Sequence, residues 1–196
     1  MACTRLMARA TAKDRLSALS DDILLNHILS EISYRDVVRS SLLSQRWRFL
    51  WRKMPSLKFC PEDFEKQKDG RIQAIINNAL VHLDAPLCCL NLQVNLDDPK
   101  AAHINTWIRL AAEKQVERMN VHISNKDPKT RLKDSSMVEL GDSIFSCENL
   151  TVLMVQYVQL PKIPTDFGVF RSLKHFTVFV CRNWMVLLIT DGPVDN

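Results

Sequence analysis

The chain has 196 residues and a mass of 22.6 kDa, and 46% of its residues are hydrophobic and 24% charged, as in an ordinary globular protein. This composition excludes a wholly disordered chain, a collagen-like repeat and a small disulfide-rich scaffold. Only 4 residues are glycine and no Walker or dinucleotide-binding motif is present, so nothing indicates a phosphate-binding loop.

Positive charge is concentrated in the N-terminal part of the chain. Residues 1–58 contain 11 of the 26 Lys and Arg but 5 of the 22 Asp and Glu, a balance of +6. These basic residues alternate with apolar ones at helical spacing, which favours a solvated helix surface. Binding of nucleic acid through Arg46, Arg48, Arg52 and Lys53 with Trp51 remains the alternative.

The sequence gives no targeting or metal-binding signal. Residues 1–13 have no apolar core and are expected to be a disordered leader, and the apolar run at 185–189 is too short to span a bilayer. The six cysteines include no C-x-x-C pair, and the five histidines are far apart in the sequence. We therefore expect free thiols, no metal, no cofactor and no catalytic residue in a cytoplasmic or nuclear protein.

Residues 14–54 are predicted to form three short helices. Ser20 and Ser33 are expected to cap the first two helices, and the third is expected to begin at Ser44. Val38 and Leu42 are expected to line the buried face of the second helix. Three helices in about 40 residues bury too little surface to be stable alone, so this unit is expected to pack against another protein.

Helices and short strands alternate after residue 60. Helices are predicted over 62–83, with Gly70 as the alternative start, and after Asp98-Pro99. Four alternating segments centred on Leu90, Met119, Leu153 and Phe176 are 29, 34 and 23 residues apart. A degenerate leucine-rich-repeat solenoid fits these spacings better than ordinary βα alternation, although the latter remains possible.

Residues 14–59, DRLSALSDDILLNHILSEISYRDVVRSSLLSQRWRFLWRKMPSLKF, closely resemble the F-box of plant F-box/leucine-rich-repeat proteins. The segments 107–111 and 146–150 resemble the repeats of the same family. The resemblance implies a leader at 1–13, an F-box at 14–59, degenerate repeats at 60–181 and an atypical tail at 182–196. The implied fold class is a three-helix domain followed by a short α/β solenoid.

The family resemblance also implies a function. Such proteins are non-catalytic subunits of ubiquitin ligases: the F-box binds a Skp-type adaptor, which links to cullin and RING subunits, and the repeats bind an unknown substrate protein. The implied adaptor-binding residues are Leu19, Ser20, Ile23, Leu24, Ile28, Leu29, Ile32, Val38, Leu43, Arg46 and Trp47. Between the buried strand positions, the expected substrate-binding residues are Asn91, Gln93, Asn120, His122, Met154, Gln156, Thr177 and Phe179. Each residue of the adaptor set could instead belong to the internal core.

Two departures from the family pattern motivate an alternative function. Ser20 replaces the usual proline, and the sequence after Cys181 no longer follows the repeat pattern. We therefore expect a truncated member of the family. The alternative is a chain that binds the Skp-type adaptor without recruiting substrate, as a competitor or a non-functional relic. No contact with nucleic acid or membrane is expected.

Overall fold

The structure is a computed structural model, and it describes residues 15–65, 67–96, 101–125, 138–156, 158–162, 172–180 and 183–187. The predictions for the leader at 1–13 and for Asp98-Pro99 lie outside these residues, as does most of the expected tail at 182–196. For Phe179 the strand backbone is described but the side chain is not.

The N-terminal unit is helical, as predicted. It consists of α1 (Asp21–Ile23), which continues as the π-helix η2 (Leu24–Leu29), then α2 (Tyr34–Ser40) and the 3-10 helix η3 (Trp47–Lys53). The expected caps at Ser20 and Ser33 are confirmed, whereas the third helix begins at Trp47, three residues after Ser44. The hydroxyl oxygens of Ser20, Ser33 and Ser44 each accept a hydrogen bond at 3.4 Å from the backbone N–H three residues further on.

The prediction that Val38 and Leu42 line the buried face of the second helix is wrong. Tyr34 and Val37 are buried instead, whereas Val38 is 39% exposed and Leu42 is 87% exposed. The helix ends at Ser40, so Leu42 lies in the following turn, where helical spacing no longer determines which way a side chain points. Val38 and Leu42, which were predicted to be buried, are therefore both exposed at the surface.

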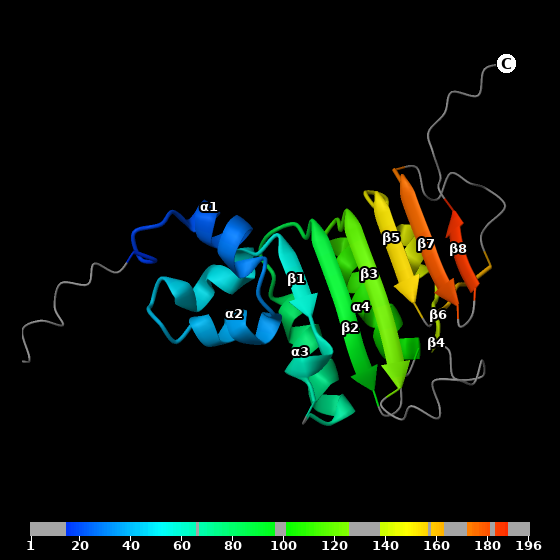
Figure 1. Cartoon of the computed structure of the whole chain (residues 1–196), viewed down its shortest axis with the longest axis horizontal. Helices are drawn as coiled ribbons and strands as arrows, with labels where there is room; N and C mark the ends of the chain where they lie inside the picture. Colours follow the sequence, from blue (N-terminus) through cyan, green and yellow to red (C-terminus); the bar gives the residue numbers. More distant parts are fainter. Residues whose placement is uncertain are drawn as a thin grey trace, which may run out of the picture.

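A six-stranded sheet follows the helical unit (Figure 1). Its strands, in spatial order, are β1 (Ser56–Phe59), β2 (Cys89–Leu96), β3 (Arg118–Asn125), β5 (Val152–Gln156), β7 (His175–Val180) and β8 (Asn183–Leu187). The first five are parallel and follow the order of the sequence, and β8 pairs antiparallel with β7. The two-residue strands β4 (Val138–Glu139) and β6 (Val158–Gln159) form a separate pair.

The predicted strand alignment is confirmed by the sheet register. Leu57, Leu90, Met119, Leu153 and Phe176 occupy one continuous row across the parallel strands. All five are at most 5% exposed. Because side chains alternate between the faces of a strand, this row fixes one face as the core and sends the intervening polar residues to the other.

Helices cover the core face of the sheet. Behind the strands in Figure 1 lie α3 (Asp69–Val81) and α4 (Ala101–Glu113), and the short 3-10 helices η4 (Pro61–Asp63) and η7 (Asp142–Ser146) complete the connections. The helix predicted over 62–83 begins only at Asp69. The reason is that Pro61–Asp63 forms a turn of its own, in which the Asp63 carboxylate accepts a hydrogen bond from the Cys60 N–H at 3.2 Å.

The helical unit packs directly against the β1 edge of the sheet (Figure 1). The ring of Tyr34 on α2 lies with its centroid 5.0 Å from that of Phe59 on β1. Arg52 donates to the Asp84 carboxylate at 2.9 Å and to the His82 carbonyl at 3.2 Å. The aromatic contact and these polar contacts join the two parts into one body with a continuous hydrophobic core.

Candidate functional site

Large exposed apolar side chains are concentrated in the helical unit. Eight such residues occur in the described part of the chain, and six of them lie between residues 16 and 49. We call these six the exposed apolar set: Leu16, Ile23, Val38, Leu42, Leu43 and Phe49. A small unit that leaves this much apolar surface in water has the composition of an interaction surface rather than of a finished domain.

The turn between α2 and η3 carries the most exposed members of this set. Leu42 is 87% exposed and Leu43 is 67% exposed, and Phe49 on η3 is 58% exposed. Backbone hydrogen bonds from Leu42 N–H to the Arg39 carbonyl and from Leu43 N–H to the Ser40 carbonyl hold the turn. The two leucines are therefore presented on an ordered backbone.

The residues predicted to bind an adaptor fall into three groups. Leu24, Leu29 and Trp47 are at most 5% exposed and belong to the internal core. Half-buried side chains that pack against this core are Leu19, Ile28 and Ile32. Exposed residues are Ser20, Ile23, Val38, Leu43 and Arg46. Because Leu24, Leu29 and Trp47 are buried, they can hold a binding surface in place but cannot contact a partner themselves.

Arg46 holds the segment that leads into the first helix. Its Nε and Nη2 donate to Oδ1 of Asp21 at 2.9 and 2.6 Å, and Nη1 and Nη2 donate to the carbonyls of Ser17 and Leu19 at 2.9 and 2.6 Å. One guanidinium thus fixes residues 17–21 against the start of η3. Its partners are backbone and carboxylate oxygens of the same chain, which leaves it less available to an external anion.

Polar side chains line the sheet face opposite the core. Asn91 and Asn120 are register neighbours, and Asn120 Nδ2 donates to Asn91 Oδ1 at 3.4 Å. The Asn120 Oδ1 atom is buried and lacks a hydrogen-bond partner among the described residues. The other predicted substrate-binding residues are Gln93, His122, Met154, Gln156 and Thr177, which are half-buried or exposed on the same face.

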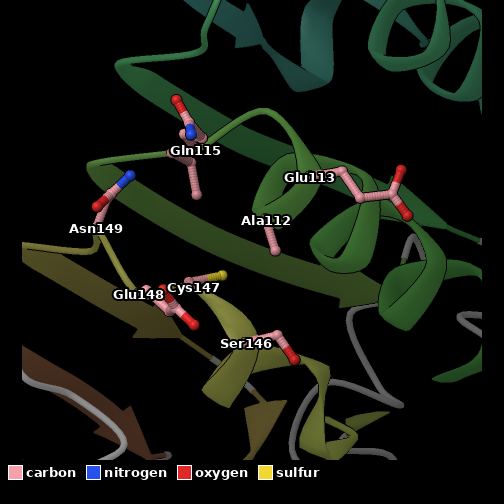
Figure 2. A pocket seen from close by; sticks show the side chains of 8 residues that line it. Ala112, Glu113, Gln115, Ser146, Cys147, Glu148 and Asn149 are labelled. Atoms are coloured by element: carbon pink, nitrogen blue, oxygen red, sulfur yellow. The ribbon is translucent and has the colours of Figure 1, made fainter.

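A hollow of about 260 Å³ lies where α4 ends near η7 (Figure 2). Gln115, with a φ of 61°, and Cys147 are among its lining residues. Burial raises the pKa of the Cys147 thiol to about 11. This thiol therefore stays protonated near neutral pH and is a poor nucleophile.

The side chains of the described ranges form no metal site. No group of three or more His, Cys, Asp or Glu side chains there is arranged to hold a metal ion. In the same part of the chain, no helix is both long and apolar enough to cross a bilayer.

Comparison with known proteins identifies the helical unit. Residues 16–59 match the F-box domain family. In Arabidopsis thaliana, an FBD-associated F-box protein is 27% identical over 92% of this chain and 42% of its own length, and an F-box/FBD/LRR-repeat protein is 30% identical over 83% and 36%. An F-box/LRR-repeat protein of the same plant is 30% identical over 78% of this chain and 47% of its own length. No solved structure gives a significant match.

These matches define the class of protein. The chain contains an F-box domain followed by a region of alternating strands and helices. It is an F-box protein of the plant F-box/LRR type. The chain spans less than half the length of the curated relatives it matches.

Sequence reasoning missed three members of the exposed apolar set: Leu16, Leu42 and Phe49. For Leu42, the available signal was its position between Ser41 and Leu43, a short apolar pair flanked by Ser40, Ser41 and Ser44. Serine clusters favour turns, so the pair could have been assigned to an exposed turn instead of a buried helix face. For Leu16 and Phe49, no local pattern distinguishes an exposed from a buried apolar residue.

Proposed function

We propose that the helical unit binds a Skp-type adaptor and that the chain is a substrate-recognition subunit of a Skp–cullin–F-box ubiquitin ligase. The observation that carries the proposal is the exposed apolar set, which places six of the eight large exposed apolar side chains of the described residues in the F-box. Burying such side chains against a partner is favourable by about 25 cal/mol for each Å² removed from water.

The exposed members of the set are proposed to make the contact. Leu42, Leu43 and Phe49 are the most accessible, and Ile23 and Val38 add apolar area on the two preceding helices. Leu24, Leu29 and Trp47 hold these helices in place from the core. An apolar contact of this kind depends little on salt, whereas a basic nucleic-acid site loses affinity steeply as salt is raised.

We infer further that the sheet region is a leucine-rich-repeat array whose polar face binds the substrate. Support comes from the sequential order of the parallel strands, the in-register apolar row and the helices on one face. Asn91, Gln93, Asn120, His122 and Gln156 are the proposed contacts on the central strands. Met154, which is 36% exposed, would add an apolar contact, and Thr177 would extend the surface along β7.

The test is capture of the full chain by purified Skp-type adaptor at 150 mM and 500 mM NaCl. The variant Leu42→Asp/Leu43→Asp places two carboxylates in the proposed contact without disturbing the core. Val81→Asp is the matched control, because Val81 is 52% exposed but lies on α3, outside the F-box.

We expect wild type and Val81→Asp to be captured equally at both salt concentrations. The double variant should lose about tenfold or more in affinity, since truncated or charged contacts at an interface centre commonly cost this much. Equal capture of all three proteins, or no capture of a folded wild-type chain, would contradict the proposal. Ubiquitination of a co-purifying protein then separates a substrate adaptor from a competitor that only occupies the Skp-type partner.

A further inference from the structure

A groove lies at the junction of the helical unit and the sheet region. Its volume is about 240 Å³, and α2, η4, α3 and the segment before α3 contribute its lining. Tyr34, Val38, Phe64 and Ile75 supply apolar surface. Because this groove is bounded by both parts of the chain, it exists only where they pack together.

Three arginines also line this groove. Arg35 and Arg39 are one helical turn apart on α2, and Arg71 and Ile75 are one turn apart on α3. Residues at a spacing of four lie on the same face of a helix. Each helix thus presents arginine together with apolar surface to the same groove.

The positive charge in the groove is only partly compensated. Asp63 is the sole acidic lining residue, and its two carboxylate oxygens already accept hydrogen bonds from Ser33 Oγ at 2.8 Å and Cys60 N at 3.2 Å. Arg39 pairs with Asp36 at 3.3 Å in an exposed contact. Neither Arg35 nor Arg71 forms an ion pair with any carboxylate in the described ranges.

The apolar lining indicates which of two anionic ligands, a single-stranded nucleic acid or an acidic peptide, fits the groove. Nucleic acids without base pairing bind by stacking bases on exposed aromatic faces. Tyr34 and Phe64 are only 7% and 4% exposed, so neither presents a free ring face. Val38 and the half-buried Ile75 instead offer aliphatic surface to one inserted side chain.

We propose that this groove binds an acidic peptide segment of a second protein, with one aliphatic side chain in the groove and carboxylates on Arg35 and Arg71. Arg39 joins the contact by exchanging Asp36 for a carboxylate of the peptide. The groove contains none of Leu42, Leu43 and Phe49, the most exposed residues of the proposed adaptor contact, and shares with that contact Val38 alone. It binds the peptide whether or not the adaptor is present.

The test uses the full chain and the fluorescein-labelled peptide Asp-Glu-Asp-Leu-Asp-Glu-Asp, with fluorescence polarisation at 50 mM and 300 mM NaCl. The matched peptide carries Ser in place of Leu, and a ten-residue oligothymidylate represents nucleic acid. We expect the leucine peptide to bind with an affinity that falls as salt is raised. Replacing Leu by Ser should weaken binding about fivefold or more, as expected for loss of one buried aliphatic side chain.

Reversing the charge of two groove arginines tests whether the peptide binds in this groove. Arg35→Glu/Arg71→Glu should weaken peptide binding at least about tenfold, since it removes two charge-assisted contacts and adds repulsion. Arg118→Glu/Lys174→Glu makes the same change in net charge on exposed residues near the starts of β3 and β7 and should bind like wild type. Equal losses in the two variants, or none in either, would overturn the proposal.

A second variant tests the groove without changing charge. Ile75→Trp fills the space and should abolish the preference for the leucine peptide over the serine peptide while leaving salt-dependent binding in place. A retained leucine preference would overturn the proposal. So would oligothymidylate binding as tightly as the leucine peptide, or displacement of the peptide by saturating Skp-type adaptor, which would assign the groove to the adaptor contact.

Discussion

Asp21 and Arg46 are joined by two hydrogen bonds of 2.9 and 2.6 Å across 25 residues of sequence, and the same guanidinium holds the carbonyls of Ser17 and Leu19. The pair connects the start of the first helix to the start of the third. It therefore holds residues 17–21 against the start of η3, just before Ile23 on α1.

Arg46→Ala should weaken the attachment of residues 17–21 and so lower the stability of the fold. An exposed ion pair alone contributes at most about 1 kcal/mol, and both side chains here are more than one third exposed. With two carbonyl contacts also lost, we expect the free energy of unfolding to fall by about 1–2 kcal/mol. Urea denaturation measures this. Arg39→Ala, which breaks only the exposed pair with Asp36, should change stability by less than about 0.5 kcal/mol.

Asn77→Ala should destabilise the packing of α3 against α4. The buried indole N–H of Trp107 donates to Asn77 Oδ1 at 2.8 Å. Without this acceptor the donor stays buried and unpaired, at a cost of about 1–3 kcal/mol. The neighbouring Asn78→Ala is the control, because Asn78 is exposed and alanine favours the helix. Equal urea midpoints for the two variants would show that the Trp107 bond contributes nothing.

Alkaline pH should destabilise the fold through Cys147. Its pKa is raised from an ordinary 9.0 to about 11, so between these values the unfolded chain releases a proton that the folded chain retains. Stability from this group is thus complete below pH 9 and declines as pH rises towards 11, by at most about 2–3 kcal/mol. Unfolding measured from pH 8 to 11 should decline less steeply in Cys147→Ala. Parallel pH profiles for the two proteins would rule out this origin.

The two glycines within the described residues should respond oppositely to alanine. Gly70 is the second residue of α3, and no atom lies within 4 Å of the position that an alanine Cβ would take there, so Gly70→Ala should stabilise by a few tenths to about 1 kcal/mol. At Gly141 a Cβ would lie 3.1 Å from Asn105 Nδ2, beside the 2.7 Å bond from Gly141 N–H to Asn105 Oδ1. Gly141→Ala should therefore destabilise. Thermal unfolding of both variants checks the contrast.

The sequence patterns that predicted the fold best were those with a strict period. Alternation in four segments was enough to align Leu90, Met119, Leu153 and Phe176, and the register confirms that alignment. Helical spacing was less decisive in short elements. Val37 and Val38 are adjacent and chemically identical, yet Val37 is buried, on the same helix face as Tyr34 three residues earlier, and Val38 is exposed.

The candidate sites were harder to predict because they depend on contacts between distant segments. Residues 14–59 resemble a known family, which indicated an adaptor contact, but nothing local separated buried Leu24 from exposed Ile23. The groove joins Arg35 to Arg71, which are far apart in the sequence and belong to different parts of the predicted architecture. No sequence motif in either segment predicts that the two segments lie side by side.

The packing of Tyr34 on Phe59 also has a thermodynamic consequence. Phe59 belongs to a strand that pairs with β2, so the aromatic contact links the helical unit to the sheet, and we expect the two parts to unfold together. A ligand that binds only the folded helices therefore raises the melting temperature of the strands as well, by linkage. Binding of a ligand to the helical unit would therefore stabilise the strands at the far end of the molecule against unfolding, without a conformational change.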